Sequence, residues 1–281
     1  MFSFGTPKRI DLGFVIGVGM AVAAITLGLR ASGIAPAYFL QPTGALIVLG
    51  GTAGVMFVAT PRAALFSCLR RICGLCSAAA TEREQLIEQI AQFARITRRD
   101  GVIGLESSTA EVRNGFLRLG LESAVDIGGK EELRNLLETE LRLRERQSEA
   151  DAKTLEVAGG FAPTIGIIGT VVGLIQVMRQ FSDLQSIGAG IGMAFVSTIY
   201  GLALANVILL PMANRIRARA AEEFEVGEMI VEGVACIAER LHPTLIRMRL
   251  NAFLKPGHKE SIHANGEPQP ASYKVGAGGL G

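Results

Sequence analysis

Residues 156–211 read EVAGGFAPTIGIIGTVVGLIQVM, then RQFSDLQS, then IGAGIGMAFVSTIYGLALANVILLP. Each of the two apolar runs is long enough to cross a bilayer, because a hydrocarbon core about 30 Å thick takes about 20 helical residues at about 1.5 Å each. Core helices of a soluble protein are also apolar on all sides, but they seldom stay free of charge over this length. The stretch therefore predicts a transmembrane hairpin of two helices.

Polar and small side chains are spread through this hairpin. Pro163 deprives the carbonyl of Gly159 of its usual amide partner, and in lipid such a carbonyl needs another partner from protein or water. The other polar residues are Thr164, Thr170, Ser197, Thr198, Tyr200 and Asn206. Small residues recur at four-residue spacing, namely Gly169 and Gly173, Gly188 and Gly192, and Ser197, Gly201 and Ala205. Ordinary helix packing accounts for small residues and hydroxyls, but together with the freed carbonyl they favour a hydrated path.

The two apolar runs lack ionisable side chains. Residues 157–178 and 187–211 contain no Asp, Glu, Lys, Arg or His. A cation crossing a membrane protein is normally bound by an acidic group within the membrane. If ions cross this hairpin, a partner must therefore supply the carboxylate.

The whole chain has the composition of a membrane protein. It has 281 residues, is 49% hydrophobic and contains no Trp, so it is too apolar for a soluble domain. Its formal net charge of +2 gives no indication of a nucleic-acid partner. Four spans are predicted, at residues 10–29, 37–59, 155–178 and 187–210.

The positions of the basic residues predict the orientation of these spans. The outer turns hold only Arg30 and Arg179, whereas the other ends of the spans carry Lys8, Arg9, Arg62, Arg70, Arg71, Arg215, Arg217 and Arg219. By the positive-inside rule, both termini and the large middle loop are cytoplasmic. The basic start of the first span also suits a signal peptide, but no cleavage pattern follows and a second span comes at once, so we expect it to be retained.

The predicted fold is an all-α integral membrane protein with four transmembrane helices and a helical cytoplasmic lobe between helices 2 and 3. We divide it into a first hairpin (1–60), the lobe (61–154), a second hairpin (155–211), a cytoplasmic helix (212–254) and a disordered tail (255–281). A long amphipathic helix at 131–156 leads into the third span. Its candidate packing positions are Leu133, Leu136, Leu137, Leu141 and Leu143.

Three stretches resemble one family. PTIGIIGTVVGLIQVM (163–178) and IGAGIGMAFVSTIYGLALANVILLPMAN (187–214) resemble the third and fourth membrane helices of the A subunit of the bacterial flagellar stator, called MotA in proton-driven motors and PomA in sodium-driven ones. ALIVLGGTAGVMFVATP (45–61) resembles the second helix. The resemblance extends over roughly residues 12–254.

This resemblance implies a function and partners. The chain would be a multi-pass protein of the bacterial inner membrane that couples inward cation flow to torque, and not an enzyme. It would form a homopentamer around a dimer of a B-type subunit, whose membrane helix brings the missing aspartate. Its lobe would push the rotor switch protein.

The resemblance also implies roles for seven residues. Pro163, Thr170, Thr198 and Pro211 fall on the ion pathway and its coupling points. In ARITRRDGVIGLE (94–106), Arg98 and Arg99 match the basic pair and Glu106 the acidic residue that present charge to the rotor. From the residues alone, these charges are a solvated helix face, and the prolines are helix-end punctuation.

The transported ion, H+ or Na+, stays open, and no bound cofactor is expected. In the family, Thr at the position of Thr170 is commoner in sodium-driven members, where a hydroxyl oxygen helps to replace water. Sodium-type members often carry an acidic residue where this chain has Gly160. These two features point to different ions, with the balance slightly toward sodium.

Five other kinds of protein or site fit the sequence less well. A TolQ or ExbB type energiser of outer-membrane processes typically has three spans, whereas four are predicted for this chain. A small-solute secondary transporter would show an internal repeat. A purely structural scaffold would not depend on membrane potential. A metal site at Cys73 and Cys76, near Cys68, would need further ligands, and no second pair or nearby His follows. No nucleophile set or phosphate loop indicates an enzyme.

Overall fold

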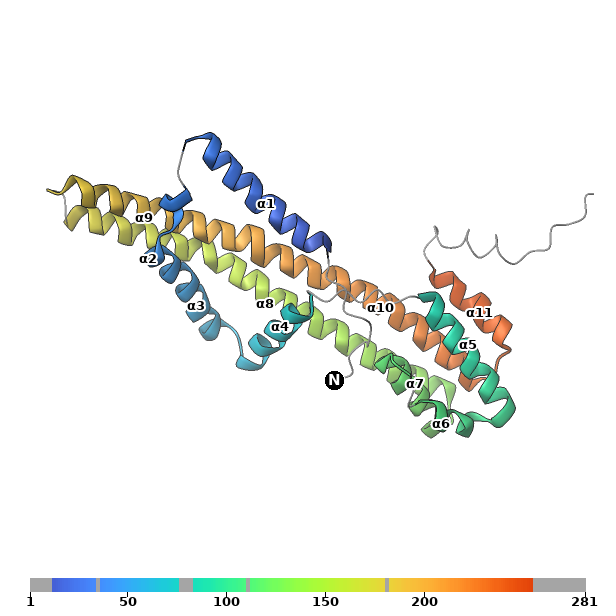
Figure 1. The fold of residues 1–281 in the computed structure, drawn as a ribbon. Coiled ribbons are helices and arrows are strands. Elements are labelled where there is room, and N and C mark those ends of the chain that lie inside the picture. Colours follow the sequence, from blue (N-terminus) through green and yellow to red (C-terminus); the bar gives the residue numbers. More distant parts are fainter. Residues whose placement is uncertain (1–11, 34–35, 76–82, 110–111, 180–181, 255–281) are drawn as a thin grey trace, which may run out of the picture.

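The protein is elongated and built on one very long helix. A computed structural model describes residues 12–33, 36–75, 83–109, 112–179 and 182–254. Helix α8 (Lys130–Arg179) runs along most of the molecule, beside α9 (Leu184–Ala203) and α10 (Leu210–Ala238) (Figure 1). All regular elements among the described residues are helices, which agrees with the predicted all-α class.

Three helical runs in the described chain are long and apolar enough to cross a membrane. They are Pro42–Ala59, Lys130–Arg179 and Ile187–Ala238, and they overlap the second, third and fourth predicted spans. Helix α1 (Leu12–Ala31) covers most of the first predicted span, with a shorter apolar stretch at Gly19–Gly28. A count of four spans therefore stays a prediction.

Two spans contain turns wider than an α-helix. The second span consists of α2 (Pro42–Ala45), the π-helix η2 (Leu46–Gly50) and α3 (Gly51–Ala59). The π-helix η4 (Leu204–Leu209) joins α9 to α10 just before Pro211. Proline has no amide for the carbonyl four residues earlier, and a π turn changes that pairing. By contrast, α8 continues through Pro163 without a break.

A helical lobe lies at the end of the molecule away from α9 (Figure 1). It contains α5 (Arg83–Asp100), η3 (Val102–Leu105), α6 (Glu106–Thr109), α7 (Gly115–Asp126), α11 (Pro243–Leu250) and η5 (Asn251–Phe253). Helix α7 begins at Asn114, whose side chain accepts hydrogen bonds from the amides of Phe116 and Leu117 at 3.0 Å each.

One buried core joins the lobe to the adjacent halves of α8 and α10. Its largest fully buried members include Ile90, Leu105, Phe116, Leu117, Leu121, Leu133, Leu137, Met229, Ile230, Ile237 and Ile246. These residues come from both the predicted lobe (61–154) and the predicted cytoplasmic helix (212–254). The two regions, which the sequence led us to separate, therefore pack together.

The predicted packing face of α8 is partly right. Leu133, Leu137 and Leu141 are buried, as predicted. Leu136 and Leu143 are 45% and 54% exposed, so their prediction as packing residues is wrong. Leu133, Leu137 and Leu141 follow one another at four-residue spacing along one face of the helix, and Leu136 and Leu143 both lie to one side of that face.

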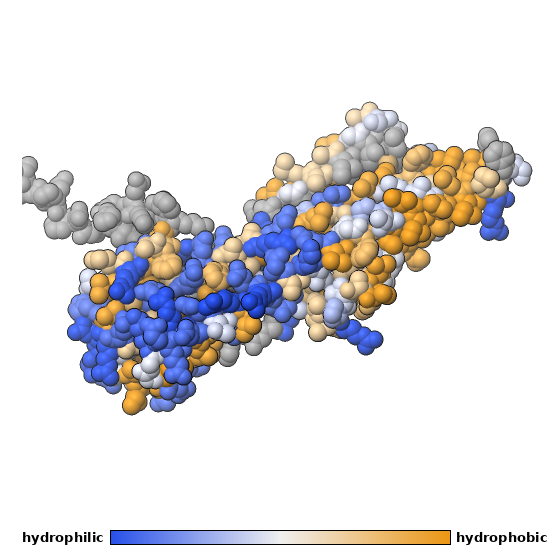
Figure 2. All heavy atoms as spheres, turned by 180° about the vertical axis from the view of Figure 1, so that it is seen from behind, coloured by the Kyte–Doolittle hydropathy of each residue, from blue (hydrophilic) through white to orange (hydrophobic). Residues whose placement is uncertain are grey.

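The surface divides into an apolar and a polar half (Figure 2). The apolar half covers the spans, where Ile167, Phe195 and Val171 are 57%, 68% and 51% exposed. The polar half covers the lobe. Exposed apolar area of this extent is typical of a surface in contact with lipid or with other membrane helices.

Candidate functional site

Glycines bring α8 and α9 close together. A Cβ added to Gly169 would lie 2.6 Å from the Cβ of Ser197, and one added to Gly173 would lie 2.8 Å from the amide nitrogen of Ala194. On α9, a Cβ on Gly201 would lie 2.6 Å from the carbonyl oxygen of Ala162. A Cβ added to Gly188 would meet no atom of the chain within 4 Å. The predicted close packing is therefore confirmed at three of these positions and not at Gly188.

Two hydroxyls face one another across this contact. Oγ1 of Thr170 lies 2.5 Å from Oγ1 of Thr198. The Thr170 hydroxyl also lies 3.1 Å from the carbonyl oxygen of Ala194 and 3.2 Å from that of Gly166. Four oxygens are thus gathered around one half-buried point at membrane depth. Such oxygens suit water or a partly dehydrated cation, because they replace the oxygens of its hydration shell.

The two prolines lie on facing helices. A Cβ added to Gly201 of α9 would lie 3.2 Å from Cα of Pro163. One turn earlier in α8, a Cβ on Gly159 would lie 3.0 Å from Cδ2 of Leu210, the residue before Pro211. Pro163 of α8 and Pro211 in the first turn of α10 thus both lie on the lobe side of the threonine pair.

The second span also contacts this pair. A Cβ added to Gly44 would lie 2.7 Å from Oγ of Ser197, a buried residue whose hydroxyl donates to the carbonyl of Met193 at 2.8 Å. The Tyr200 hydroxyl donates to the carbonyl of Phe39 and accepts from the amide of Gln41 at 3.3 Å. The sequence singled out Ser197 and Tyr200 as polar groups, but it carried no sign of these partners.

Other polar residues of the hairpin stay apart from the threonine pair. The exposed Thr164 hydroxyl donates to the carbonyl of Phe161 at 2.7 Å, and the exposed Asn206 amide donates to that of Leu202 at 3.0 Å. In α3, the buried Thr52 hydroxyl has no hydrogen-bond partner among the described residues. Thr52 was not predicted as a functional residue, because a single hydroxyl in a glycine-rich helix gives no sequence signal.

The predicted rotor-contact charges lie at the end of the lobe that is away from the spans. Arg98 and Arg99 lie in the last turn of α5, and Glu106 begins α6 after a turn at Gly101, whose φ of +77° favours glycine. All three side chains are exposed. Arg99 pairs with Asp100 at 2.9 Å, and its hydrogen bond lowers the pKa of that carboxyl. The turn thus presents charges of both signs on one connection.

A cluster of ion pairs on the lobe side of the spans was not predicted from the sequence. Nε of Arg71, on α4 (Arg62–Leu75), lies 2.8 Å from Oδ2 of Asp151 on α8. Arg217 of α10 pairs with Glu149 at 2.7 Å and with Glu156 at 2.5 Å, and its hydrogen bond lowers the pKa of Glu149. Partners so far apart in the chain leave no pattern in the sequence.

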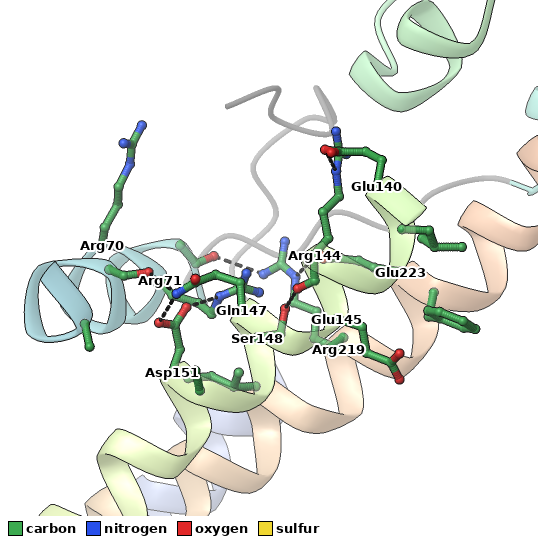
Figure 3. Close-up of a pocket in the computed structure, with 18 of the residues that line it drawn as sticks. Arg70, Arg71, Glu140, Arg144, Glu145, Gln147, Ser148, Asp151, Arg219 and Glu223 are labelled. Carbon is green, nitrogen blue, oxygen red and sulfur yellow. Dashed lines mark hydrogen bonds and ion pairs between the residues drawn. The ribbon is translucent and has the colours of Figure 1, made fainter. Parts of the chain in front are cut away.

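A pocket of about 1100 Å³ lies beside these pairs, between α4, α8 and α10 (Figure 3). Its walls carry Arg70, Arg71, Arg144 and Arg219 together with Glu140, Glu145, Asp151 and Glu223. The thiol of Cys68 is buried nearby, and burial followed by the charge of Asp151 raises its pKa to about 11. The thiol therefore stays protonated at neutral pH.

The described residues hold no group of three or more His, Cys, Asp or Glu side chains able to bind a metal. Cys76 lies outside the described residues, so the prediction against a metal at the CxxC spacing stays a prediction.

Comparisons with known proteins agree on one family. The model of the MotA/TolQ/ExbB proton channel family matches residues 108–229. The chain is 31% identical over 255 residues to motility protein A of Treponema phagedenis, covering 91% of this chain and 98% of that protein. It is 28% identical over 270 residues to motility protein A of Bacillus subtilis (strain 168), covering 94% and 98%. The solved structure of C. jejuni MotAB is similar with a TM-score of 0.81 and 28% identity, covering 88% of this chain and 97% of that one.

Proposed function

This chain belongs to the motility protein A family of MotA/TolQ/ExbB proton channels, and from that premise we propose that its α8–α9 pair forms the ion path of a flagellar stator. The chain is the A-type stator subunit, which couples ion flow to torque and is not an enzyme. The solved relative is a MotAB complex, which supports a B-type partner for this chain.

The observation that carries the proposal is the threonine pair within a helix pair that lacks acidic groups. The hydroxyls of Thr170 and Thr198 lie 2.5 Å apart, while residues 157–178 and 187–211 contain no ionisable side chain. The pair offers oxygens to a moving cation but cannot neutralise its charge. A membrane aspartate from the B subunit completes the site.

Ion passage releases enough free energy to shift the packing of such helices. One cation moving down about 150 mV releases about 3 to 4 kcal/mol, scaled from about 2.3 kcal/mol per 100 mV. Bundles with two packed arrangements differ by a few kcal/mol, so single ions can step the assembly between them without unfolding it. Pro163 and Pro211 provide the bending points at the inner end of the pair.

The finer arrangement follows the family. The chain crosses the inner membrane four times, so both termini and the lobe lie in the cytoplasm. Five copies of this chain surround two B subunits. Binding of a cation to the aspartate changes its contacts near Thr170 and Thr198, and the ring steps around the B pair. Arg98, Arg99 and Glu106 then push the rotor, because complementary exposed charges set approach and register.

The transported ion is H+ or Na+, and the Thr170 hydroxyl slightly favours sodium. Swimming speed measured against external sodium, with and without a proton uncoupler, identifies it. A speed that rises with sodium and survives the uncoupler indicates sodium. A speed that ignores sodium and collapses with the uncoupler indicates protons.

Reconstitution into vesicles tests the proposal as a whole. The chain alone should not conduct, and the chain co-purified with its B subunit should conduct. The B aspartate changed to Asn is the control and should stop conduction. Conduction by the A chain alone would contradict the shared site.

A further inference from the structure

Four polar residues join α4 to α8 on the lobe side of the spans. The Arg71 guanidinium donates from Nε to Oδ2 of Asp151 at 2.8 Å, and the Gln147 amide donates to Oδ1 at 3.1 Å. The same Gln147 amide lies 3.0 Å from Oγ of Ser67. Figure 3 shows the Arg71 and Asp151 side chains directed at one another across the two helices. We call Ser67, Arg71, Gln147 and Asp151 the α4–α8 clasp.

The clasp is built to remain closed. Asp151 is 1% exposed, and each of its carboxylate oxygens has a partner from the clasp. A carboxylate that loses its cation while it stays buried is strongly destabilising, because its charge is then uncompensated. The Arg71–Asp151 pair therefore favours the closed clasp.

Other contacts also hold α4. Its buried apolar contact is a small cluster in which Cys68 packs with Ala152, Leu155, Ala213 and Ile216, and Ile72 of α4 packs against this cluster. Beside the pocket of about 1100 Å³ (Figure 3), Nη1 of Arg219 on α10 donates to the carbonyl oxygen of Gly74 on α4 at 3.0 Å. The polar clasp, the small apolar cluster and this hydrogen bond together set the position of α4 against α8 and α10.

The second span is attached to the helix pair at two levels. Its outer part touches Ser197 through Gly44, and its middle touches Ile165 through Gly51. Ser197 is the neighbour of Thr198 in the candidate ion path. Beyond α3 the chain turns at Thr60, which has extended backbone, and continues as α4 to the clasp. The clasp is therefore a third level of attachment between this part of the chain and α8, beyond the two levels within the span.

The opposite side of α8 is fastened at the same height. Arg217 of α10 bridges Glu149 and Glu156, which flank Asp151 along α8. Helix α8 is thus held on two sides where the apolar half of the molecule meets the charged half.

We propose that the α4–α8 clasp stays closed throughout the working cycle and makes the second span and α8 move as one body, so that displacement at the threonine pair reaches the lobe. Arg71 and Asp151 are then positioning residues for torque. This inference rests on the proposed function, but cation conduction alone does not require the clasp.

Neutralising the buried carboxylate is the first test. In Asp151→Asn, torque of tethered cells at high load should fall several-fold, while the amount in the membrane, co-purification with the B subunit and cation conduction stay normal. Glu223→Gln is the matched control, because it removes a carboxylate of the same pocket that pairs with Arg219 at the surface. Unchanged torque in Asp151→Asn overturns the proposal. A fall in torque that only follows a fall in membrane protein overturns it as well.

A covalent clasp is the second test and does not depend on folding of a neutralised variant. Ser67→Cys with Gln147→Cys, in a chain whose four native cysteines are alanine, can be joined by a short thiol-reactive linker. The linked stator should keep its torque, and the link should restore torque to Asp151→Asn. If the link stops rotation, the clasp must open during the cycle. If the link fails to restore torque to Asp151→Asn, the clasp has no role in torque. Failure of the proposed function would instead appear as absent conduction in the unsubstituted complex.

Discussion

The hydroxyl oxygens of Thr170 and Thr198 lie 2.5 Å apart, one on each helix of the α8–α9 pair. Each threonine also reaches the carbonyl of Ala194, at 3.1 Å from Thr170 and 3.5 Å from Thr198. Two side chains 28 residues apart therefore share one acceptor. If this oxygen cluster is the ion path, losing either hydroxyl must affect conduction.

Thr170→Val and Thr198→Val should each lower cation conduction of the complex with its B subunit. A missing hydrogen-bonding group at a fully buried polar site costs about 1 to 3 kcal/mol, and at this half-buried site the lower end of that range, about 1 kcal/mol or roughly a 5-fold effect, is expected. Thr170→Ser should keep most of the activity, because it retains the oxygen. Thr164→Val is the control, since that hydroxyl is exposed and bonds within its own helix. Full conduction in the double valine variant would remove the threonine pair from the ion path.

Gly201→Ala should destabilise the assembled protein. Its new methyl group would lie 2.6 Å from the carbonyl oxygen of Ala162, and a backbone atom cannot move aside as a side chain can. Overpacking of this kind costs about 1 to 3 kcal/mol. Gly188→Ala is the matched control on the same helix, where the added methyl group meets no atom within 4 Å. Thermal unfolding in detergent compares the two. Equal melting temperatures would mean that α8 and α9 are not in tight contact in the assembled protein.

Much of the fold was predictable from the sequence, because membrane spans are long apolar runs and their hydroxyls and prolines are visible in it. Thr170 and Thr198 were singled out in this way. Their contact was not predictable, because the pattern within each helix does not fix the register between two helices.

Other features were hidden for different reasons. The clasp joins Arg71 to Asp151 across 80 residues, and charged side chains on a helix give the same pattern whether solvated or paired. The π turns before Pro211 and in the second span were missed because helix prediction assumes a 3.6-residue period. The lobe core combines two distant segments, whose pairing is set by tertiary packing alone.

Pro163→Ala should stabilise α8 and stop motility. The substitution gives the carbonyl of Gly159 an amide partner and removes a proline from the helix interior, which favours the helix by up to about 3 kcal/mol. If bending at this point is part of the cycle, the stiffer helix should assemble normally but not drive rotation. Thermal unfolding, membrane insertion and swimming are the measurements. Pro211→Ala, beside the π-helix η4, should behave in the same way. Normal swimming in both variants would exclude hinges at these positions.

Reversing the charges at the end of the lobe should separate conduction from torque. Arg98→Glu with Arg99→Glu should abolish rotation and leave conduction unchanged, because the exposed end of α5 is far from α9 along the molecule (Figure 1). Glu106→Lys should act likewise. Arg142→Glu is the control, since Arg142 is exposed on α8 and pairs within its own helix with Glu138 at 2.9 Å. Rotation that persists in the triple charge reversal would place the rotor contact elsewhere.

The Glu88–Arg247 pair predicts the direction of a pH effect on the lobe. The hydrogen bond from Arg247 lowers the pKa of Glu88, so the ionised pair stabilises the folded lobe above the ordinary glutamate pKa of about 4.3. That contribution is lost as the pH falls through the lower, folded-state pKa. The effect should be small, because Glu88 is 58% exposed and surface pairs contribute little.

Arg247→Gln isolates this contribution. The variant should melt at a lower temperature than the unsubstituted protein at pH 7. The difference in melting temperature should shrink as the pH is lowered below about 4, because Glu88 is then protonated and no longer forms an ion pair with Arg247 in the unsubstituted protein. Arg146→Gln, on an exposed stretch of α8, removes the same charge without touching Glu88, so it corrects for the change in net charge. A difference that stays constant or grows as Glu88 is protonated would show that Arg247 stabilises the lobe through packing rather than through this carboxylate.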